Sequence, residues 1–335
     1  MSPKISVLIP MYNRKHYIEQ CINSALNQTF TDYEIIVRDD GSTDGSADFV
    51  AERYAAEISS GKLKLRRNEK NIGEFSTDNR LLREATGKYI MILHSDDLYL
   101  PHALEQMYTI AETFQADVVH ESVYLTTAPD GIIKEGSPLW IIPYDKNPVQ
   151  EVTVMPDDKV SRFNEWDFGG TGVDAQHNLF KRGFLTDNDL RFETFGGNRL
   201  FALQWIMAAK VLVKTPAPFY IYRNSPDSVT RANFSPERVT RFISNQLELA
   251  RWLDKFFAAD DFFKDKPEMQ YRARSHLFYV FSHWDIIRRG VYKDGVTPEL
   301  NQAVADAFKK YFGDDATYPT FLFHWIHAVS LTKKD

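Results

Sequence analysis

Four short predicted strands, three of them rich in apolar, β-favouring residues, alternate with helical patterns in the first part of this 335-residue chain. The predicted strands are Ile5–Pro10, Tyr33–Val37, Leu63–Arg67 and Tyr89–Leu93. Helices are predicted between them, and a further one runs from Pro101 to about Phe114. Strands that alternate with helices form a parallel sheet through right-handed crossovers. The sequence therefore predicts an α/β fold with a mostly parallel sheet flanked by helices.

The fourth predicted strand runs directly into His94, Ser95, Asp96 and Asp97. In open α/β sheets, ligands bind at the carboxyl ends of the strands. Two adjacent carboxylates repel each other there unless a cation or hydrogen-bond donors neutralise them. Carboxylate oxygens favour Mg²⁺ or Mn²⁺, and these cations in turn favour a diphosphate ligand. The alternative interpretation is a solvated acidic turn that caps the next helix.

The composition narrows the classes of function. Forty basic against 46 acidic residues give a net charge of -6, which argues against a nucleic-acid binder held by counterion release. The single cysteine, Cys21, cannot form an internal disulfide and suits a reducing compartment. The N-terminus does not resemble a signal peptide, and no apolar run reaches the length of a membrane span. A cytoplasmic protein is expected.

Beyond the fourth strand the pattern is less regular. Strand character returns at Asp117–Leu125 and again at Val211–Val213, just after a helix predicted at Arg199–Ala209. Between them, Ala128–Asp158 is rich in Pro, Gly and Asp and is predicted to be irregular. The segment Phe168–Gly172 is either a tight backbone passage past a ligand or a plain turn.

The last third changes to helical spacing. Ser235 and Pro236 predict a helix start, and three or four amphipathic helices follow to the end of the chain. Apolar stripes on these helices need a partner surface. We therefore expect them to form an oligomer interface or an acceptor platform, apart from any nucleotide site.

Several stretches together resemble the family-2 nucleotide-sugar glycosyltransferases of the GT-A fold. They are ISVLIPMYNR, INSALNQTFTDYEIIVRDDGSTDGS, NEKNIG and EATGKYIMILHSDDLYLP. The likeness is detailed over about the first 125 residues and weakens through Arg231. It implies a GT-A domain over residues 1–231, with a donor half at 1–127 and an acceptor half at 128–231, followed by a C-terminal helical region at 232–335.

The resemblance implies a metal-dependent, inverting transfer of a hexosyl or N-acetylhexosaminyl group from a UDP-sugar to an acceptor hydroxyl. The acceptor would be a carbohydrate, glycolipid or glycoprotein, in the synthesis of cell-surface polysaccharides or glycoconjugates. No nucleic-acid partner is implied. Peripheral contact with the inner face of the cell membrane and homo-oligomerisation through the C-terminal helices are left open.

The same resemblance implies roles for individual residues. Tyr12 would stack on the uracil base, and Asp39 would accept the imide N–H of uracil. Asp96 would hold the ribose, while Asp97 would bind the Mn²⁺ or Mg²⁺ that bridges the two phosphates; relatives divide these tasks differently, so Asp96 is also a metal candidate. The full donor-binding set comprises Pro10, Tyr12, Asn13, Asp39, Asn79, Arg80, His94, Ser95 and Asp96.

The chain departs from the family pattern at three places. His94 stands where relatives often carry the first Asp of Asp-X-Asp-Asp. Asp78 stands where relatives commonly carry an Arg before the Asn at position 79, and Arg80 is the nearest replacement for that charge. Gly197 and Asn198 stand where relatives carry Glu-Asp or Gly-Asp, the Asp of which is the catalytic base.

Because asparagine cannot take a proton, the catalytic position Asn198 raises the question of which group serves as base. Glu193 is the leading candidate, and Asp174 and His177 are the others. The alternative function is a non-catalytic nucleotide-sugar-binding or assembly subunit that has lost its base. A nucleotidyltransferase would need a Gly- and Lys-rich loop after the first strand, and Met11–Arg14 is not one.

Overall fold

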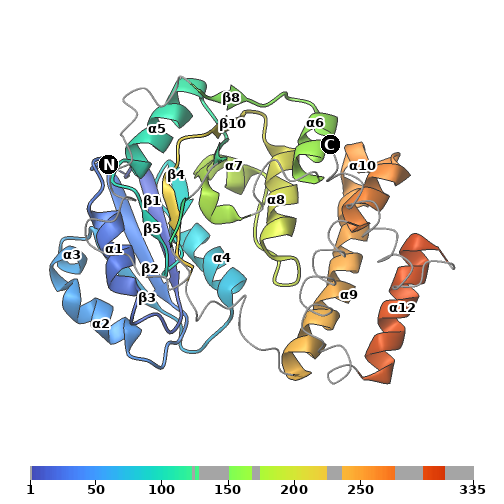
Figure 1. The fold of residues 1–335 in the computed structure, drawn as a ribbon, viewed down its shortest axis with the longest axis horizontal. Coiled ribbons are helices and arrows are strands. Elements are labelled where there is room, and N and C mark those ends of the chain that lie inside the picture. Colours follow the sequence, from blue (N-terminus) through green and yellow to red (C-terminus); the bar gives the residue numbers. More distant parts are fainter. Residues whose placement is uncertain are drawn as a thin grey trace. The chain divides into compact units, whose positions relative to one another are not determined.

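The structure is a computed structural model that describes residues 2–122, 125–127, 151–167, 174–224, 236–275 and 297–313. The chain forms two compact units, Met1–Arg231 and Ala232–Asp335 (Figure 1). The predicted segment Phe168–Gly172, most of Ala128–Asp158 and the end of the chain from residue 314 lie outside the described residues.

The first unit is built on a sheet of eight strands over its described residues. In spatial order they are β3 (Leu63–Arg67), β2 (Tyr33–Asp39), β1 (Ile5–Met11), β4 (Tyr89–Ile92), β9 (Asn178–Lys181), β6 (Val118–Glu121), β10 (Leu212–Thr215) and β8 (Thr153–Val154). β1, β2, β3 and β4 pair in parallel, as do β6 and β10, whereas β9 and β8 pair antiparallel with their neighbours. The prediction of a mostly parallel α/β sheet is confirmed.

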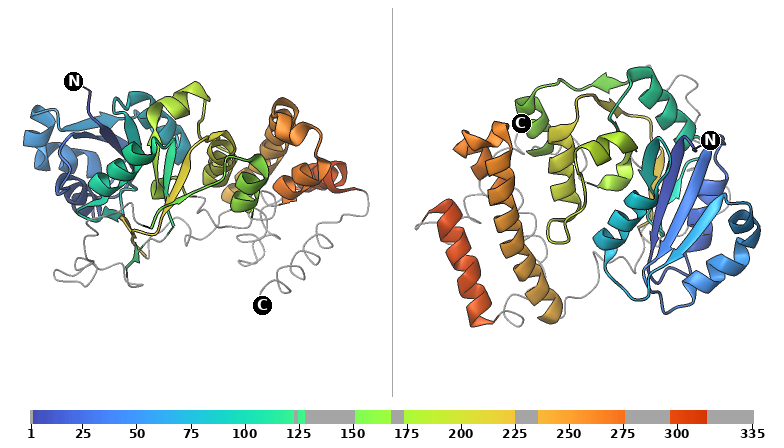
Figure 2. Two further views of the ribbon diagram at one scale, coloured as in Figure 1. Left: turned by 90° about the horizontal axis from the view of Figure 1, so that it is seen from above. Right: turned by 180° about the vertical axis from the view of Figure 1, so that it is seen from behind.

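Helices flank this sheet, as Figure 2 shows from two further sides. They are α1 (Ile18–Leu26), α2 (Ser46–Arg53), α3 (Ala55–Ser59), α4 (Glu74–Glu84), α5 (Ala103–Phe114), α6 (Lys159–Asp167), the 3₁₀ turn η2 (Ala175–His177), α7 (Arg182–Asp187) and α8 (Gly197–Ala208). The predicted apolar face of α1 is buried, with Ile18, Cys21, Ile22 and Ala25 all inaccessible to solvent. Helix α4 packs on β1 and β2, and α5 packs on β6 and β9.

A second, three-stranded sheet was not anticipated from the sequence. It consists of β5 (Leu98–Tyr99), β11 (Tyr220–Tyr222) and β7 (Leu125–Thr126), in that order. The predicted strand at Asp117–Leu125 is therefore divided, because β6 belongs to the large sheet and β7 to the small one. Since β5 follows Asp97 directly, the small sheet ties the acidic loop to a strand more than 120 residues further along the chain.

The second unit contains α9 (Pro236–Ala259), α10 (Asp261–Lys264) and α12 (Pro298–Phe312), and residues 267–275 are helical as well. Helix α9 packs against both α10 and α12. Its residues Leu249, Ala250, Leu253 and Phe257 are buried. These four residues of its apolar stripe are therefore covered, and the oligomer interface that we expected from the stripe stays a prediction.

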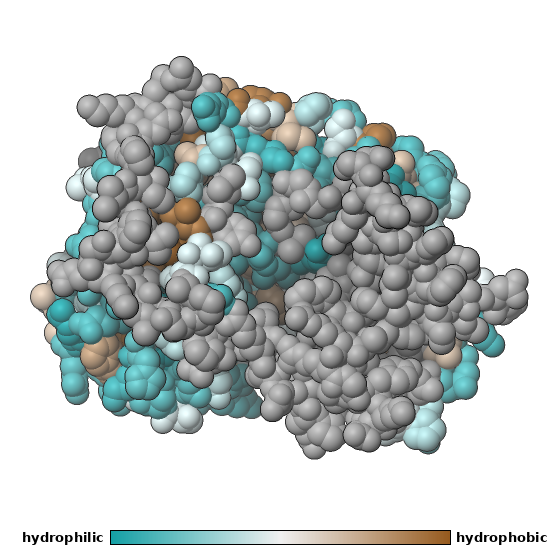
Figure 3. All heavy atoms as spheres, in the orientation of Figure 1, coloured by the Kyte–Doolittle hydropathy of each residue, from teal (hydrophilic) through white to brown (hydrophobic). Residues whose placement is uncertain are grey.

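The described surface carries few large apolar side chains. Only Tyr12, Val154, Val160 and Tyr271 are exposed among the described residues of that kind. On the face drawn in Figure 3, the described atoms are mainly hydrophilic and the apolar ones gather in small separate patches. In the part of the chain that the structure describes, no helix combines the length and apolar character needed to cross a bilayer.

A buried histidine in this core makes stability depend on pH. His120 on β6 is 1% exposed, and its Nδ1 lies 2.9 Å from the side-chain oxygen of Asn178 on β9. Burial lowers the pKa of His120 to about 4, against about 6.5 in an unfolded chain. A lowered pKa stabilises the fold above the unfolded value, and this contribution is lost as the pH falls from about 6.5 toward 4.

We therefore expect the free energy of unfolding to decrease by about 2 kcal/mol between pH 7 and pH 5 through His120 alone. Urea titrations at the two pH values measure the decrease. In His120→Gln, the free energy of unfolding should decrease between pH 7 and pH 5 by about 2 kcal/mol less than in the parent. An equal decrease in the parent and in His120→Gln would contradict the assignment.

Candidate active site

The predicted site residues follow three neighbouring strands. β1 pairs with both β2 and β4, so the loops that begin at Tyr12, Asp40 and His94 meet at one edge of the sheet. The first two loops are joined by Asn13, which has a positive φ of 52°. Its N–H donates to Ser42 Oγ at 2.8 Å, and its side-chain oxygen accepts from the Thr43 N–H at 2.8 Å.

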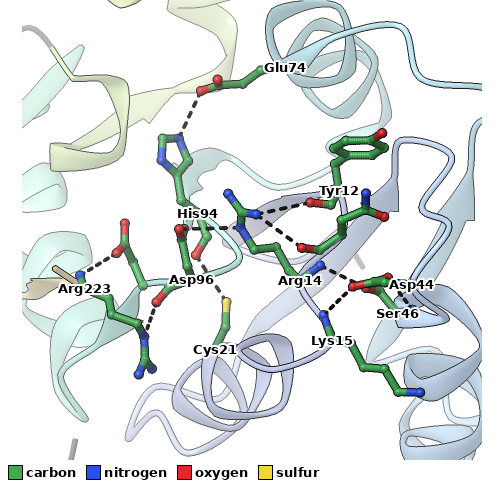
Figure 4. Close-up of polar contacts among 12 residues, drawn as sticks. Tyr12, Arg14, Lys15, Cys21, Asp44, Ser46, Glu74, His94, Asp96 and Arg223 are labelled. Atoms are coloured by element: carbon green, nitrogen blue, oxygen red, sulfur yellow. Dashed lines mark hydrogen bonds and ion pairs between the residues drawn. The ribbon is translucent and has the colours of Figure 1, made fainter. Parts of the chain in front are cut away.

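Asp96 is the carboxylate that faces the first loop. Its Oδ2 lies 3.5 Å from Nε of Arg14, and the two side chains are 20% and 19% exposed (Figure 4). The Arg14 guanidinium also donates to the carbonyl oxygen of Asn13 at 3.2 Å. Arg14 was not among the residues predicted from the sequence, since an arginine in a loop gives no signal of its own. It places a positive charge beside the acidic loop.

Asp97, in contrast, is turned into the protein and is 1% exposed. Its Oδ2 accepts a hydrogen bond from the Tyr220 hydroxyl at 2.6 Å, and its Oδ1 accepts from the Arg223 N–H at 2.7 Å. Burial and the neighbouring charge of Asp96 raise the pKa of Asp97 to about 7. Each oxygen of Asp97 thus has one protein partner, and the role of Asp97 in binding a cation stays a prediction. Asp96 is the better placed of the two.

His94 lies among carboxylates. Its Nε2 is 3.9 Å from Oε1 of Glu74, the first residue of α4 (Figure 4). Burial opposes protonation, but the nearby charges of Glu74, Asp97, Asp78 and Asp96 raise the pKa of His94. An imidazole in this position favours its cationic form, which suits contact with a phosphate better than with a metal ion.

Two of the departures from the family pattern, Asp78 and His94, act on each other electrostatically. Asp78 on α4 is 3% exposed, and its pKa is raised by burial and by Glu74, while His94 acts in the opposite direction. Relatives commonly carry a basic residue at position 78 and an acidic one at position 94. This chain has the acidic residue on the helix and the basic residue on the loop, so the signs of the pair are reversed.

The residues predicted to contact the uracil base lie at the ends of β1 and β2. Tyr12 is 42% exposed, so its ring is open to a stacking partner. Asp39 is 3% exposed and accepts from the Ser42 N–H at 3.1 Å, which fixes its carboxylate at the end of β2. Pro10 and Ser95 are both buried beside these loops. Their roles in binding stay predictions.

Asn79 and Arg80 form hydrogen bonds within the protein. The Asn79 side chain donates to the Phe192 carbonyl at 2.7 Å and accepts from the Phe192 N–H at 3.0 Å. Arg80 donates to the Asn68 side chain at 2.7 Å. These contacts join Asn79 to the segment before α8 and Arg80 to Asn68, which follows β3. The roles of both residues in donor binding stay predictions.

That segment brings the start of α8 to the donor loops. Gly197 has a φ of +55°, and a Cβ added there would lie 3.0 Å from the Phe75 ring. Phe75 follows Glu74, which faces His94, so the partly exposed Asn198 at the start of α8 lies on the same side of the fold. A Glu at position 197, as in relatives, would meet both the unfavourable backbone angle and this ring.

The other base candidates differ in their surroundings. Oε1 of Glu193 forms an ion pair with Nε of Arg191 at 3.3 Å. His177 is 3% exposed, and its Nδ1 lies 3.1 Å from Oε2 of Glu121. Burial lowers the pKa of His177 to about 3. An imidazole so enclosed is a structural group rather than a base for an incoming hydroxyl.

No group of three or more His, Cys, Asp or Glu side chains arranged to hold a metal ion occurs among the described residues. Mg²⁺ sites often use one or two carboxylates together with the phosphates of the substrate, without a protein cage. A partly exposed Asp96, whose carboxylate faces the sheet edge, fits this kind of site. The residues therefore suit a cation that arrives with a diphosphate.

Comparison with known proteins gives matches of two kinds. Chondroitin synthase of Escherichia coli is 38% identical over 135 residues, which are 40% of this chain and 18% of that protein. The poly(ribitol-phosphate) beta-N-acetylglucosaminyltransferase TarP of Staphylococcus aureus (strain N315) is 28% identical over 233 residues, 67% of this chain and 64% of TarP. The chain thus spans less than two thirds of the length of either relative.

Among solved structures, S. aureus TarS 1-349 in complex with UDP-GlcNAc aligns with a TM-score of 0.65 and 20% identity, covering 92% of this chain and 80% of that one. This likeness shows a shared GT-A fold. Residues 6–167 match the sequence model of Glycosyl transferase family 2. The region that matches contains β1, β2, β4 and the whole of the acidic loop. On its sequence, the region of residues 6–167 belongs to glycosyltransferase family 2.

Proposed function

We propose that this protein is a glycosyltransferase that moves a sugar from a UDP-sugar to an acceptor hydroxyl. The observation that carries the proposal is the placement of Tyr12, Asp39 and Asp96 at the ends of three adjacent strands. The named activities of TarP and of chondroitin synthase support transfer of a sugar in polysaccharide synthesis. The complex of TarS with UDP-GlcNAc supports UDP as the nucleotide.

The donor would lie across this edge of the sheet. Uracil stacks on the exposed ring of Tyr12, and the fixed carboxylate of Asp39 accepts the imide N–H, which cytosine lacks. The diphosphate then reaches the loop of Asp96, where Arg14 and the cationic form of His94 supply positive charge. Tyr220 and Arg223 keep this loop in place by holding Asp97.

Asp96 and the diphosphate would together hold Mn²⁺ or Mg²⁺. When bound, the cation supplies Lewis-acid stabilisation of the departing UDP. The protein's own contribution is to position the diphosphate between Asp96, Arg14 and His94 and to aim the sugar toward the start of α8. There, Asn198 can hydrogen-bond the acceptor hydroxyl but cannot accept its proton.

The transfer is proposed to invert the configuration at the anomeric carbon, since a single attack from the side opposite UDP needs only one base.

A second candidate function is favoured by one observation. Asn198 stands at the position of the catalytic Asp in relatives, so a subunit that binds nucleotide sugars without turnover would have the same donor site. The two functions differ in whether UDP is released from a bound donor.

Incubation of the full chain and Mn²⁺ with UDP-, GDP- and dTDP-sugars tests the proposal, with release of the nucleoside diphosphate as the readout. We expect release from UDP-sugars and little from the GDP-sugars. Binding of UDP-sugars without release, with every acceptor class supplied, would favour the non-catalytic function. Preferential release of GDP would contradict the role of Tyr12 and Asp39.

A further inference from the structure

Asp174, immediately before η2, is an acid beside both halves of the proposed reaction centre. This 3₁₀ turn packs against β4, whose end carries the donor loop, and against α8, whose start carries Asn198. The groups that act on the Asp174 carboxylate come from those same two places. They are His94 of the donor loop and Arg199 of α8, the residue after Asn198.

The main chain around Asp174 holds it in this position. The Asp174 carbonyl accepts hydrogen bonds from the Asn178 side chain at 3.1 Å and from the His177 N–H at 3.4 Å. Both contacts use the main-chain oxygen, so they leave the carboxylate for another purpose. The residue is only partly buried, which leaves it room to meet a ligand.

The remaining candidates are occupied. Glu193 pairs with Arg191, and the imidazole of His177 is enclosed against Glu121. Asn198 has no basic atom with a useful pKa. Of the four residues considered from the sequence, Asp174 alone combines a carboxylate with neighbours on both the donor and the acceptor side.

We propose that Asp174 is the general base of this enzyme and replaces the acid that Asn198 lacks; the inference rests on the proposed transferase function. The acceptor O–H gives its proton to the Asp174 carboxylate while the acceptor oxygen forms a bond to the anomeric carbon. The bond from that carbon to the β-phosphate oxygen breaks, and its electron pair leaves with UDP. The protonated Asp174 then returns its proton to solvent.

The electrostatics of the site suit this role. Burial raises the pKa of Asp174, and His94 and Arg199 limit the rise. A base is most effective when its pKa approaches the working pH, provided that it stays ionised. The rate should therefore decline as the pH falls through the raised pKa of Asp174, because only the ionised form can accept the proton.

The test compares Asp174→Asn with the parent in two measurements. They are UDP release from whichever of UDP-GlcNAc, UDP-GalNAc, UDP-glucose and UDP-galactose the parent cleaves fastest, and UDP affinity by calorimetry. Asparagine preserves the main-chain contacts and the shape of the side chain. We expect UDP release to fall by about 10²–10⁴ with UDP affinity unchanged, as for loss of a general base. Asp189→Asn, which removes an exposed carboxylate outside the proposed site, is the matched control and should keep the parent's rate.

A second variant moves the base. In Asp174→Asn combined with Asn198→Asp, a carboxylate returns to the position used by relatives, and UDP release should recover in part. The parent's decline at low pH should be absent from Asp174→Asn. If Asp174→Asn releases UDP at the parent's rate, the inference is overturned and the transferase function is left intact. The same holds if the variant loses UDP affinity as much as it loses rate. If the parent and Asn198→Asp both bind UDP and neither releases it, the transferase function fails and the inference fails with it.

Discussion

Replacing Asp96 by asparagine is expected to abolish most of the gain in UDP affinity that Mn²⁺ provides. Asp96 is the carboxylate of the acidic pair that stays partly exposed, and it faces the loop of Arg14. Loss of a residue that merely supports a metal ligand already costs about 10–100-fold in affinity, so loss of the ligand should cost at least as much. Calorimetric titration of UDP with and without Mn²⁺ measures the effect.

Asp97→Asn is the matched control, one residue away on the same loop. Asp97 accepts hydrogen bonds from the Tyr220 hydroxyl and from the Arg223 N–H. Its replacement should therefore alter the position of the loop and the stability of the protein more than it alters metal binding. The gain from Mn²⁺ should persist in Asp97→Asn at a reduced overall affinity. The reverse pattern, with the gain lost in Asp97→Asn and kept in Asp96→Asn, would show that the buried carboxylate turns outward to bind the cation.

The second large effect concerns the reversed pair of Asp78 and His94. Asp78→Arg alone would place two cationic groups near each other in a nearly closed site, since residue 78 is 3% exposed. An uncompensated buried charge costs about 3–5 kcal/mol, and a nearby like charge adds to that cost. His94→Asp alone would gather a further carboxylate beside Glu74 and Asp78.

The double variant Asp78→Arg with His94→Asp restores the order of charges found in relatives. Its stability should exceed the sum of the two single effects, with a coupling of about 0.5–3 kcal/mol in a double-mutant cycle from urea unfolding. A matched cycle of Asp78→Arg with Glu193→Gln should show no coupling. Additive effects in the first cycle would mean that the two departures from the family pattern arose independently.

The strands and loops of the donor side could be predicted because their signals are local. The strands β1, β2 and β4 are rich in apolar residues, and the acidic loop stands out by its charge. The strands β5, β9 and β11 could not be predicted, because two to four residues carry too little pattern. Their pairing depends on long-range contacts, such as Tyr220 with Tyr99.

In the candidate site, too, local features could be predicted from the sequence and long-range contacts could not. Asp96 and Asp97 are identical in type and adjacent in sequence, and only the contacts from Tyr220 and Arg223 distinguish the one that faces inward. The family resemblance placed Asn79 in the donor set, and no sequence signal indicated that its side chain bonds to the main chain of Phe192, 113 residues away. The departures at Asp78 and His94 were visible in the sequence, whereas their electrostatic interaction was not.

The central claim is that the edge of the sheet formed by β1, β2 and β4 binds UDP with the help of a divalent cation. Titration of the intact chain with UDP, GDP and dTDP in the presence and absence of Mn²⁺ tests it most directly. The account predicts that UDP binds most tightly and that Mn²⁺ strengthens its binding. A chain that binds none of the three nucleotides, or binds UDP no better with Mn²⁺ than without it, would contradict the account.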